Sequence, residues 1–101
     1  MIECTDLVFL NDGYCVAIAE IYIKKMDLDI SNIKVFQKGE KEWISLPSRR
    51  YEVNGKYIYK PVIKFRNKDL HNKFMIQVKE AIDKKIEIER DNIFAKEEHI
   101  F

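Results

Sequence analysis

The chain has 101 residues, of which 47% are hydrophobic, and this size and composition fit one domain with a compact core rather than several domains. The formal net charge is only +1, but the charges are unevenly placed. Residues 1–33 carry two basic and six acidic side chains, residues 34–79 carry twelve and four, and residues 80–101 carry four and seven. The basic middle favours a polyanionic partner, although a lysine-rich solvated surface would give the same count.

Cys4 and Cys15 give no sign of a metal site, because they form no Cys-x-x-Cys pair and have no nearby histidine. Both lie in apolar, strand-like surroundings, where a free cysteine behaves as a small core residue. The sequence also contains no signal peptide and no apolar run of membrane length. We therefore expect a cytoplasmic protein with no metal, no cofactor and no membrane partner.

Alternating apolar residues and turn signals predict several β-strands in the first part of the chain. Turns are indicated by Asn11-Asp12-Gly13, Lys38-Gly39-Glu40-Lys41 and Asn54-Gly55. The predicted strands cover residues 2–10, 14–24, 32–37, 42–46 and 57–59. In the second strand one face is expected to carry Cys15, Ala17, Ala19, Ile21 and Ile23. The opposite face carries Tyr14, Val16, Ile18, Glu20 and Tyr22, so this strand is expected to be covered on both sides.

From about Asn67 the apolar period changes from two to 3.6, which predicts an amphipathic helix lying on a sheet. Its apolar stripe consists of Leu70, Phe74, Val78, Ala81 and Ile82. Asn67 or Asp69 is expected to cap the N-terminus, and Glu80 and Lys84 are spaced for an ion pair.

Ile76 points away from this stripe, as a lone exposed residue or as part of a subunit contact. The tail from Glu87 onward has no clear period, so it could continue the helix, add a strand or fray.

Several strands followed by one long helix predict an α+β fold, in which an antiparallel sheet of about five strands carries the C-terminal helix on one face. We expect a single domain over residues 1–101, with a tail from about residue 88 whose structure the pattern leaves open. The second sheet face, or an edge strand, then needs cover, and a homodimer formed through sheet edges or faces would supply it. Four tyrosines suit such a half-exposed surface: Tyr14, Tyr22, Tyr57 and Tyr59.

The most informative motif is Leu46-Pro47-Ser48-Arg49-Arg50. Because proline has no N–H for a sheet ladder, the strand at residues 42–46 must end there, and a short extended segment in a loop should follow. Each arginine is a permanently charged, planar fork of donors that suits phosphate or carboxylate. Neighbouring side chains of an extended segment point in opposite directions, so the two arginines are expected to do different jobs.

Residues 30–55 resemble the SpoVG family, small bacterial proteins named for stage V sporulation and septation. The most specific match is the aromatic–Ile–x–Leu–Pro–Ser–Arg–Arg element at residues 43–50, followed by the Asn-Gly turn. The resemblance covers roughly residues 3–86 and includes Asn67-Lys68-Asp69 at the helix start, while Lys60-Pro61-Val62 stands where the family has His-Pro-Ile. It implies a homodimer of small α+β subunits that binds DNA or RNA as a regulator affecting septation, cell division and sporulation. By position, it assigns family-motif residues to Ser48, Arg49, Arg50 and Lys73.

We therefore interpret the chain as a nucleic-acid-binding regulator that contacts mainly phosphates and takes no small-molecule substrate. The candidate nucleic-acid-binding residues are Ser48, Arg49, Arg50, Lys56, Lys68 and Lys73. Three further cations lie in the same segment, namely Lys60, Lys64 and Arg66. Tyrosines that could stack on unpaired bases are Tyr51, Tyr57 and Tyr59. The absence of a helix-turn-helix, a zinc finger or an aromatic RNP motif argues against base-specific readout.

An enzyme is not expected, because Ser48 lacks a Gly-x-Ser-x-Gly elbow and a histidine in its motif. His71 falls within the apolar arc of the helix, where a packed or edge histidine is more plausible than a general base. Glu40 and Glu42 flank a turn, and the three glycines form no phosphate loop. The main alternative is a non-enzymatic, homodimeric protein-interaction module in which the arginine pair holds carboxylates rather than phosphates.

Overall fold

The computed structural model describes the backbone of residues 1–100 and the side chains of residues 1–91. The predicted α+β class is confirmed: strands fill the first part of the chain and one long helix follows. The elements are β1 (Ile2–Asp12), β2 (Cys15–Ile23), the 3-10 turn η1 (Lys24–Met26), β3 (Leu28–Lys38), β4 (Lys41–Ser45), β5 (Ser48–Val53), β6 (Lys56–Pro61) and α1 (Lys68–Ile100).

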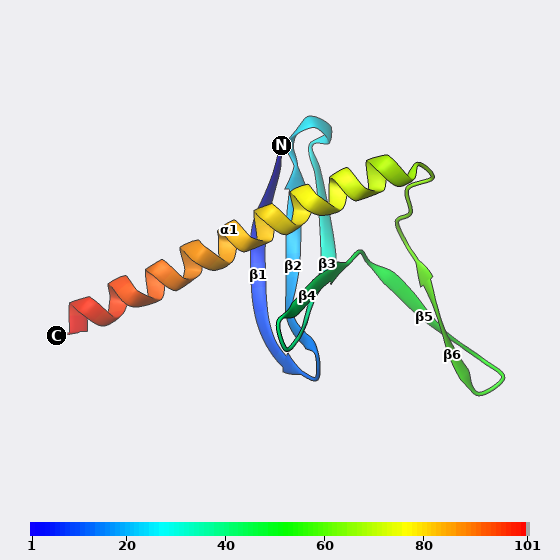
Figure 1. The fold of residues 1–101 in the computed structure, drawn as a ribbon, viewed down its shortest axis with the longest axis horizontal. Helices are drawn as coiled ribbons and strands as arrows, with labels where there is room; N and C mark the ends of the chain where they lie inside the picture. The colour runs from blue at the N-terminus through cyan, green and yellow to red at the C-terminus, as the bar shows by residue number, and fades with distance from the viewer. Residues whose placement is uncertain (101) are drawn as a thin grey trace.

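The strands form two separate sheets rather than the single sheet of about five strands that we expected. One is an antiparallel sheet in the order β1-β2-β3-β4, and the other is the hairpin β5-β6, which stands apart from it (Figure 1). The chain leaves the larger sheet at Leu46-Pro47, where proline cannot continue the ladder. The segment expected as an extended loop is therefore a strand, β5, which pairs with β6 across the predicted Asn54-Gly55 turn. Both turn residues have positive φ, 52° and 76°, as a two-residue hairpin turn requires.

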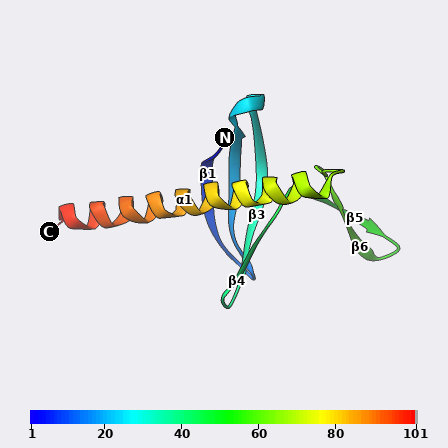
Figure 2. The ribbon, with the colours of Figure 1, turned by 45° about the horizontal axis from the view of Figure 1, so that its top comes forward.

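Helix α1 crosses one face of the four-stranded sheet, and the hydrophobic core lies between them (Figures 1 and 2). The buried core residues are Cys4, Ala17, Ala19, Ile21, Ile30, Ile33, Val35, Val78 and Ile82. Val78 and Ile82 of the predicted stripe are fully buried, and Phe74 and Ala81 pack against the same cluster. Leu70 is instead 55% exposed, because the first turn of α1 lies beyond the larger sheet.

Outside the stripe, Ile76 is exposed as expected, and the tail continues the helix, which was one of the three alternatives. Asn67 provides the predicted cap, since its Oδ1 accepts a hydrogen bond from the backbone N–H of Leu70 at 3.1 Å. The helix is therefore one continuous element from the cap to Ile100.

Lys79 attaches the helix to the edge of the larger sheet. Its Nζ lies 2.8 Å from Glu42 Oε1 of β4 and 3.0 Å from Asp83 Oδ2 of its own helix. Burial acts to lower the pKa of Lys79, but the hydrogen bonds to the two carboxylates outweigh it, so that the pKa is raised. The expected pair of Glu80 and Lys84 is not among the ion pairs of the described side chains; the pairs at that spacing are Lys79–Asp83 and Lys85–Glu89.

Four irregularities in the strand pairing decide which side chains face the helix. One lies between Cys15 and Ala17, where β2 shifts register against β3. Because a bulge breaks the strict alternation of faces, Cys15 lies opposite Phe36, on the side away from the helix. The expected faces of β2 are thus right for Ala17, Ala19 and Ile21 and wrong for Cys15.

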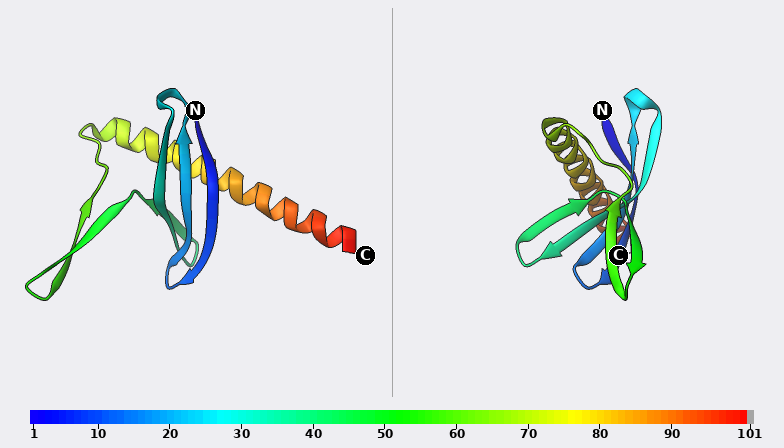
Figure 3. Two further views of the ribbon diagram at one scale, coloured as in Figure 1. Left: turned by 180° about the vertical axis from the view of Figure 1, so that it is seen from behind. Right: turned by 90° about the vertical axis from the view of Figure 1, so that its right-hand side faces the viewer.

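The sheet face turned away from α1, called the outer face below, is not covered by any element of residues 1–100 (Figure 3). The expectation that β2 is covered on both sides is therefore not met within this chain. Cys4 and Cys15 are free thiols, one buried and one half-buried, and burial raises the pKa of Cys4.

Candidate nucleic-acid interface

The hairpin β5-β6 projects from the four-stranded sheet and its helix, together called the body (Figure 3). All residues of the hairpin, 48–61, are exposed. It carries four cations, Arg49, Arg50, Lys56 and Lys60, and one carboxylate, Glu52. The hairpin packs neither face on the body, so its side chains do not contribute to the hydrophobic core. They are therefore available to contact solvent or a binding partner.

The register of the hairpin separates the two arginines. Arg49 lies opposite Lys60, and Arg50 lies opposite Tyr59. Because side chains alternate along each strand, one face, the Arg50 face, consists of Ser48, Arg50, Glu52, Tyr57, Tyr59 and Pro61. The other, the Arg49 face, consists of Arg49, Tyr51, Val53, Lys56, Ile58 and Lys60. The expectation that the arginines point in opposite directions is confirmed.

Tyrosine rings hold the cations on both faces. The guanidinium carbon of Arg50 lies 4.4 Å from the ring centroid of Tyr57, and that of Arg49 lies 5.7 Å from Tyr51. Lys60 Nζ lies 5.9 Å from the same Tyr51 ring. Such contacts limit the motion of a cation above a ring while its N–H groups remain free to donate to an anion.

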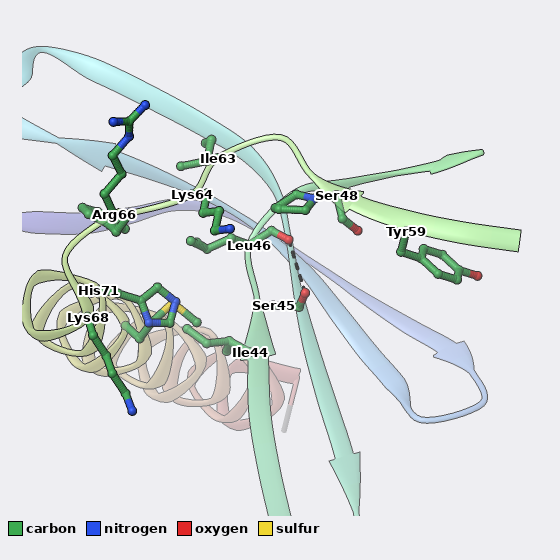
Figure 4. Close-up of a pocket in the computed structure, with 13 residues that line it drawn as sticks. Ile44, Ser45, Leu46, Ser48, Tyr59, Ile63, Lys64, Arg66, Lys68 and His71 are labelled. Carbon is green, nitrogen blue, oxygen red and sulfur yellow. Dashed lines mark hydrogen bonds between the residues drawn. The ribbon is translucent and has the colours of Figure 1, made fainter.

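An open pocket of about 640 Å³, called the root pocket, lies where the hairpin, the linker to the helix and the first turns of α1 meet (Figure 4). Its apolar lining consists of Ile44, Leu46, Pro61, Ile63, Phe65 and Met75, and its polar lining of Ser45, Ser48, Tyr59, Lys64, Arg66, Lys68 and His71. Figure 4 shows the Lys64 ammonium directed into the pocket, whereas Arg66 and Lys68 point away from it on either side. The pocket thus has an apolar floor and three cations around it.

His71 belongs to the packing of this floor. It is half-buried and meets the edge of Phe65 with ring centroids 6.1 Å apart and planes at 64°, while Phe65 lies 5.0 Å from Phe74. This agrees with the expectation of a packed histidine at the edge of the apolar arc.

The structure brings together only part of the predicted site. Ser48 and Lys68, far apart in the sequence, line the same root pocket. Arg49 and Arg50 lie just beyond it on opposite hairpin faces, and Lys56 lies at the far end beside the turn. Lys73 is exposed on the second turn of α1 and does not line the pocket. The site is therefore a basic strip along the hairpin and its root rather than one cluster.

Sequence reasoning missed a second group of cations and rings, which lies on the outer face of the larger sheet. Lys34, Phe36 and Lys38 recur at every second position of β3, and Lys41 and Trp43 do so in β4. The sequence pattern that predicts this group is an alternation with a period of two, in which lysine and aromatic residues fall on the same sheet face.

Within residues 1–91, no three His, Cys, Asp or Glu side chains lie close enough together to hold a metal ion. The described part of the chain also contains no helix that is both long enough and apolar enough to cross a lipid bilayer.

No protein-family model, no curated protein and no solved structure matches this chain. The resemblance to the SpoVG family therefore stays a prediction that rests on the motif at residues 43–50.

Proposed function

We propose that this protein is a homodimeric, cytoplasmic regulator of SpoVG type that binds nucleic acid through phosphate contacts made by the β5-β6 hairpin and its root. The observation that carries the proposal is the charge of residues 48–73, which hold eight cations and two carboxylates, on a hairpin exposed on both faces and on the linker and helix start beside it. Electrostatic attraction of this kind supplies most of sequence-independent binding to DNA or RNA. The two free thiols fit a reducing compartment.

The shape of the hairpin supports a duplex as one substrate. The major groove of DNA admits a two-stranded β-ribbon, and six residues per strand span about 20 Å. With Arg49 and Arg50 on opposite faces, a ribbon in the groove would meet phosphates on both sides. Lys64 and Lys68 at the root would then contact the backbone next to the groove.

Dimerisation is supported by the apolar part of the Arg49 face. Val53 is 47% exposed, Tyr51 44% and Ile58 41%. Tyr51 and Ile58 are opposite each other in the middle of the face, with Arg49 and Lys60 at one end and Val53 opposite Lys56 at the other. A lone hairpin of two strands is marginally stable in water, so burial of these residues against a second copy would stabilise it. The cations would lie at the rim of that contact, where they stay free for phosphate.

The alternative, an interaction module that holds carboxylates, uses the same side chains. Among residues 1–91 neither Arg49 nor Arg50 forms an ion pair with a carboxylate, so both guanidiniums are open to either kind of anion. The salt dependence of oligonucleotide binding separates the two functions, because each phosphate neutralised on duplex DNA adds roughly 0.9 to the log–log slope.

The test is a titration of labelled duplex DNA, single-stranded DNA and RNA at two salt concentrations. The double variant Arg49→Ala/Arg50→Ala is compared with Lys24→Ala/Lys25→Ala, which removes two adjacent exposed cations from η1, away from the hairpin. We expect salt-sensitive duplex binding that the arginine variant loses and the lysine variant keeps. No binding to any of the three, or equal duplex affinity and salt slope in the folded arginine variant, would overturn the proposal.

A further inference from the structure

The outer face of the four-stranded sheet carries a cluster of aromatic rings, called the aromatic platform, formed by Tyr14, Phe36 and Trp43. Phe36 and Trp43 lie opposite each other on β3 and β4 and are stacked, with centroids 5.5 Å apart and planes at 14°. Tyr14 is 55% exposed and Trp43 is 38% exposed. Tyr14 is fixed beside β3, because its carbonyl oxygen accepts a hydrogen bond from the Gln37 N–H at 2.8 Å.

The platform borders an open groove of about 460 Å³. Its lining residues are Leu10, Asp12, Tyr14, Cys15, Ile18, Lys34, Phe36 and Trp43. The groove is apolar along β1 and β2 and aromatic towards β4, with one lysine and one carboxylate at its border. Flat rings beside an open apolar groove suit a planar ligand more than a compact one.

Lysines surround the rings. Lys38 Nζ lies 5.2 Å from the Tyr14 ring centroid, Lys41 Nζ lies 5.9 Å from that of Trp43, and Lys34 lines the groove itself. Lys38 and Lys41 are directly opposite each other at the end of the ladder, and neither is ion-paired within the described side chains. Like charges opposite each other destabilise a sheet, so a bound anion would relieve this repulsion.

We propose that this outer face binds single-stranded nucleic acid, with bases stacked on Trp43 and Tyr14 and phosphates held by Lys34, Lys38 and Lys41. The inference rests on the proposed function and adds a second, strand-selective surface to it. Stacking requires unpaired bases, whose faces a duplex hides, whereas the hairpin suits a duplex. A second copy of the chain centred on the same rings would bring the lysines of both copies together, which disfavours that occupant.

The chain offers a direct probe of this surface, because Trp43 is its sole tryptophan. A base stacked on the indole quenches its fluorescence, so the experiment titrates the protein with oligothymidylate and, separately, with duplex DNA of the same length. We expect quenching by the single strand that weakens as salt is added, and little quenching by the duplex. Tyr14→Ala should weaken single-strand affinity about tenfold or more, since stacking one base is worth roughly one such factor.

Charge variants separate this inference from the proposed function. Lys34→Ala/Lys38→Ala/Lys41→Ala keeps Trp43 and should lose single-strand quenching while it retains duplex binding. Arg49→Ala/Arg50→Ala should show the converse, and Lys24→Ala/Lys25→Ala should retain both. Duplex binding by the wild type without single-strand quenching would overturn the inference and leave the proposed function standing.

Two further outcomes also overturn it. A Trp43 signal that changes with protein concentration alone, without nucleic acid, would assign the platform to a second copy. Binding of neither nucleic acid would overturn the inference together with the proposed function.

Discussion

Arg49 and Arg50 are adjacent in the chain but have different surroundings. Arg50 lies close above Tyr57, whereas Arg49 shares Tyr51 with Lys60 on the opposite face. A lysine would keep the charge at either position but would lose the planar fork that both stacks on a ring and donates to two oxygens. The two guanidiniums are thus presented on opposite sides of the hairpin.

Replacement of Lys79 should lower the stability of the helix and the four-stranded sheet rather than alter the hairpin. Lys79→Met removes the contacts with Glu42 and Asp83 and should lower the free energy of unfolding by up to about 1 kcal/mol, a modest value because the lysine side chain is 32% exposed. Since the pKa of Lys79 is raised on folding, its contribution is present at neutral pH and is lost as the pH rises through that raised value, above 10.5.

Chemical denaturation of wild type and variant at neutral and at strongly alkaline pH measures this difference. Lys84→Met, which removes an exposed lysine from the same helix, is the matched control and should change stability little at either pH. An equal loss in both variants would contradict the role given to Lys79.

At the scale of elements, the β5-β6 hairpin depends on its own turn. Gly55 has φ of 76°, which side chains rarely adopt, so Gly55→Val should loosen the hairpin without disturbing the four-stranded sheet. Hydrogen exchange should show faster exchange over residues 48–61 and unchanged protection of β2.

Gly39→Val strains the β3–β4 turn in the same way, at a φ of 62°, and serves as the control that leaves exchange of the hairpin unchanged. Loss of protection in β2 of the Gly55→Val protein would instead show that the four-stranded sheet depends on the hairpin for its stability. Nucleic-acid binding by the same variant should weaken, because its cations would no longer be held in order.

The elements that the sequence predicted well are those with strong local signals. Asn54-Gly55 marked its hairpin, and the stripe from Phe74 to Ile82 marked the helix. In residues 48–53 only Tyr51 and Val53 alternate with polar residues, because the hairpin buries neither face, and this short pattern predicts a loop rather than a strand. The sheet face to which Cys15 belongs depends on a bulge, and no pattern of residues in the sequence predicts that bulge.

The sequence predicted which residues belong to the candidate site but not how they are arranged in space. That Ser48 and Lys68 line the same pocket depends on the path of the chain between the hairpin and the helix, which is a tertiary property. The lysines around Phe36 and Trp43 follow a period of two in the sequence, but their assignment to strands and turns does not by itself show that they surround an exposed groove.

At the scale of the whole molecule, the protein is elongated. Its principal extents are 58 × 36 × 24 Å and its radius of gyration is 16.0 Å, against about 13 Å for a compact domain of this length. The hairpin and the C-terminal half of α1 both reach beyond the sheet (Figure 1). In the proposed dimer, a second copy would cover the apolar side chains that the hairpin exposes.

Sedimentation of the wild type should therefore report a dimer, and Ile58→Ser on the Arg49 face should shift it towards monomer. Ile76→Ser, which removes an isoleucine that is more exposed (58% against 41%) but lies on the helix, is the control and should leave the dimer intact. A monomeric wild type, or dissociation by Ile76→Ser instead, would contradict dimerisation through the hairpin.

The register shifts in β1 have one more consequence. β1 is one of the two edge strands of the larger sheet, and its irregular pairing at Cys4/Asp6 and Phe9/Asp12 bends the row of backbone groups that it turns towards solvent. A bent edge that also carries Glu3 and Asp6 is a poor template for further strands. This edge of the sheet is thereby protected against growth into fibrils.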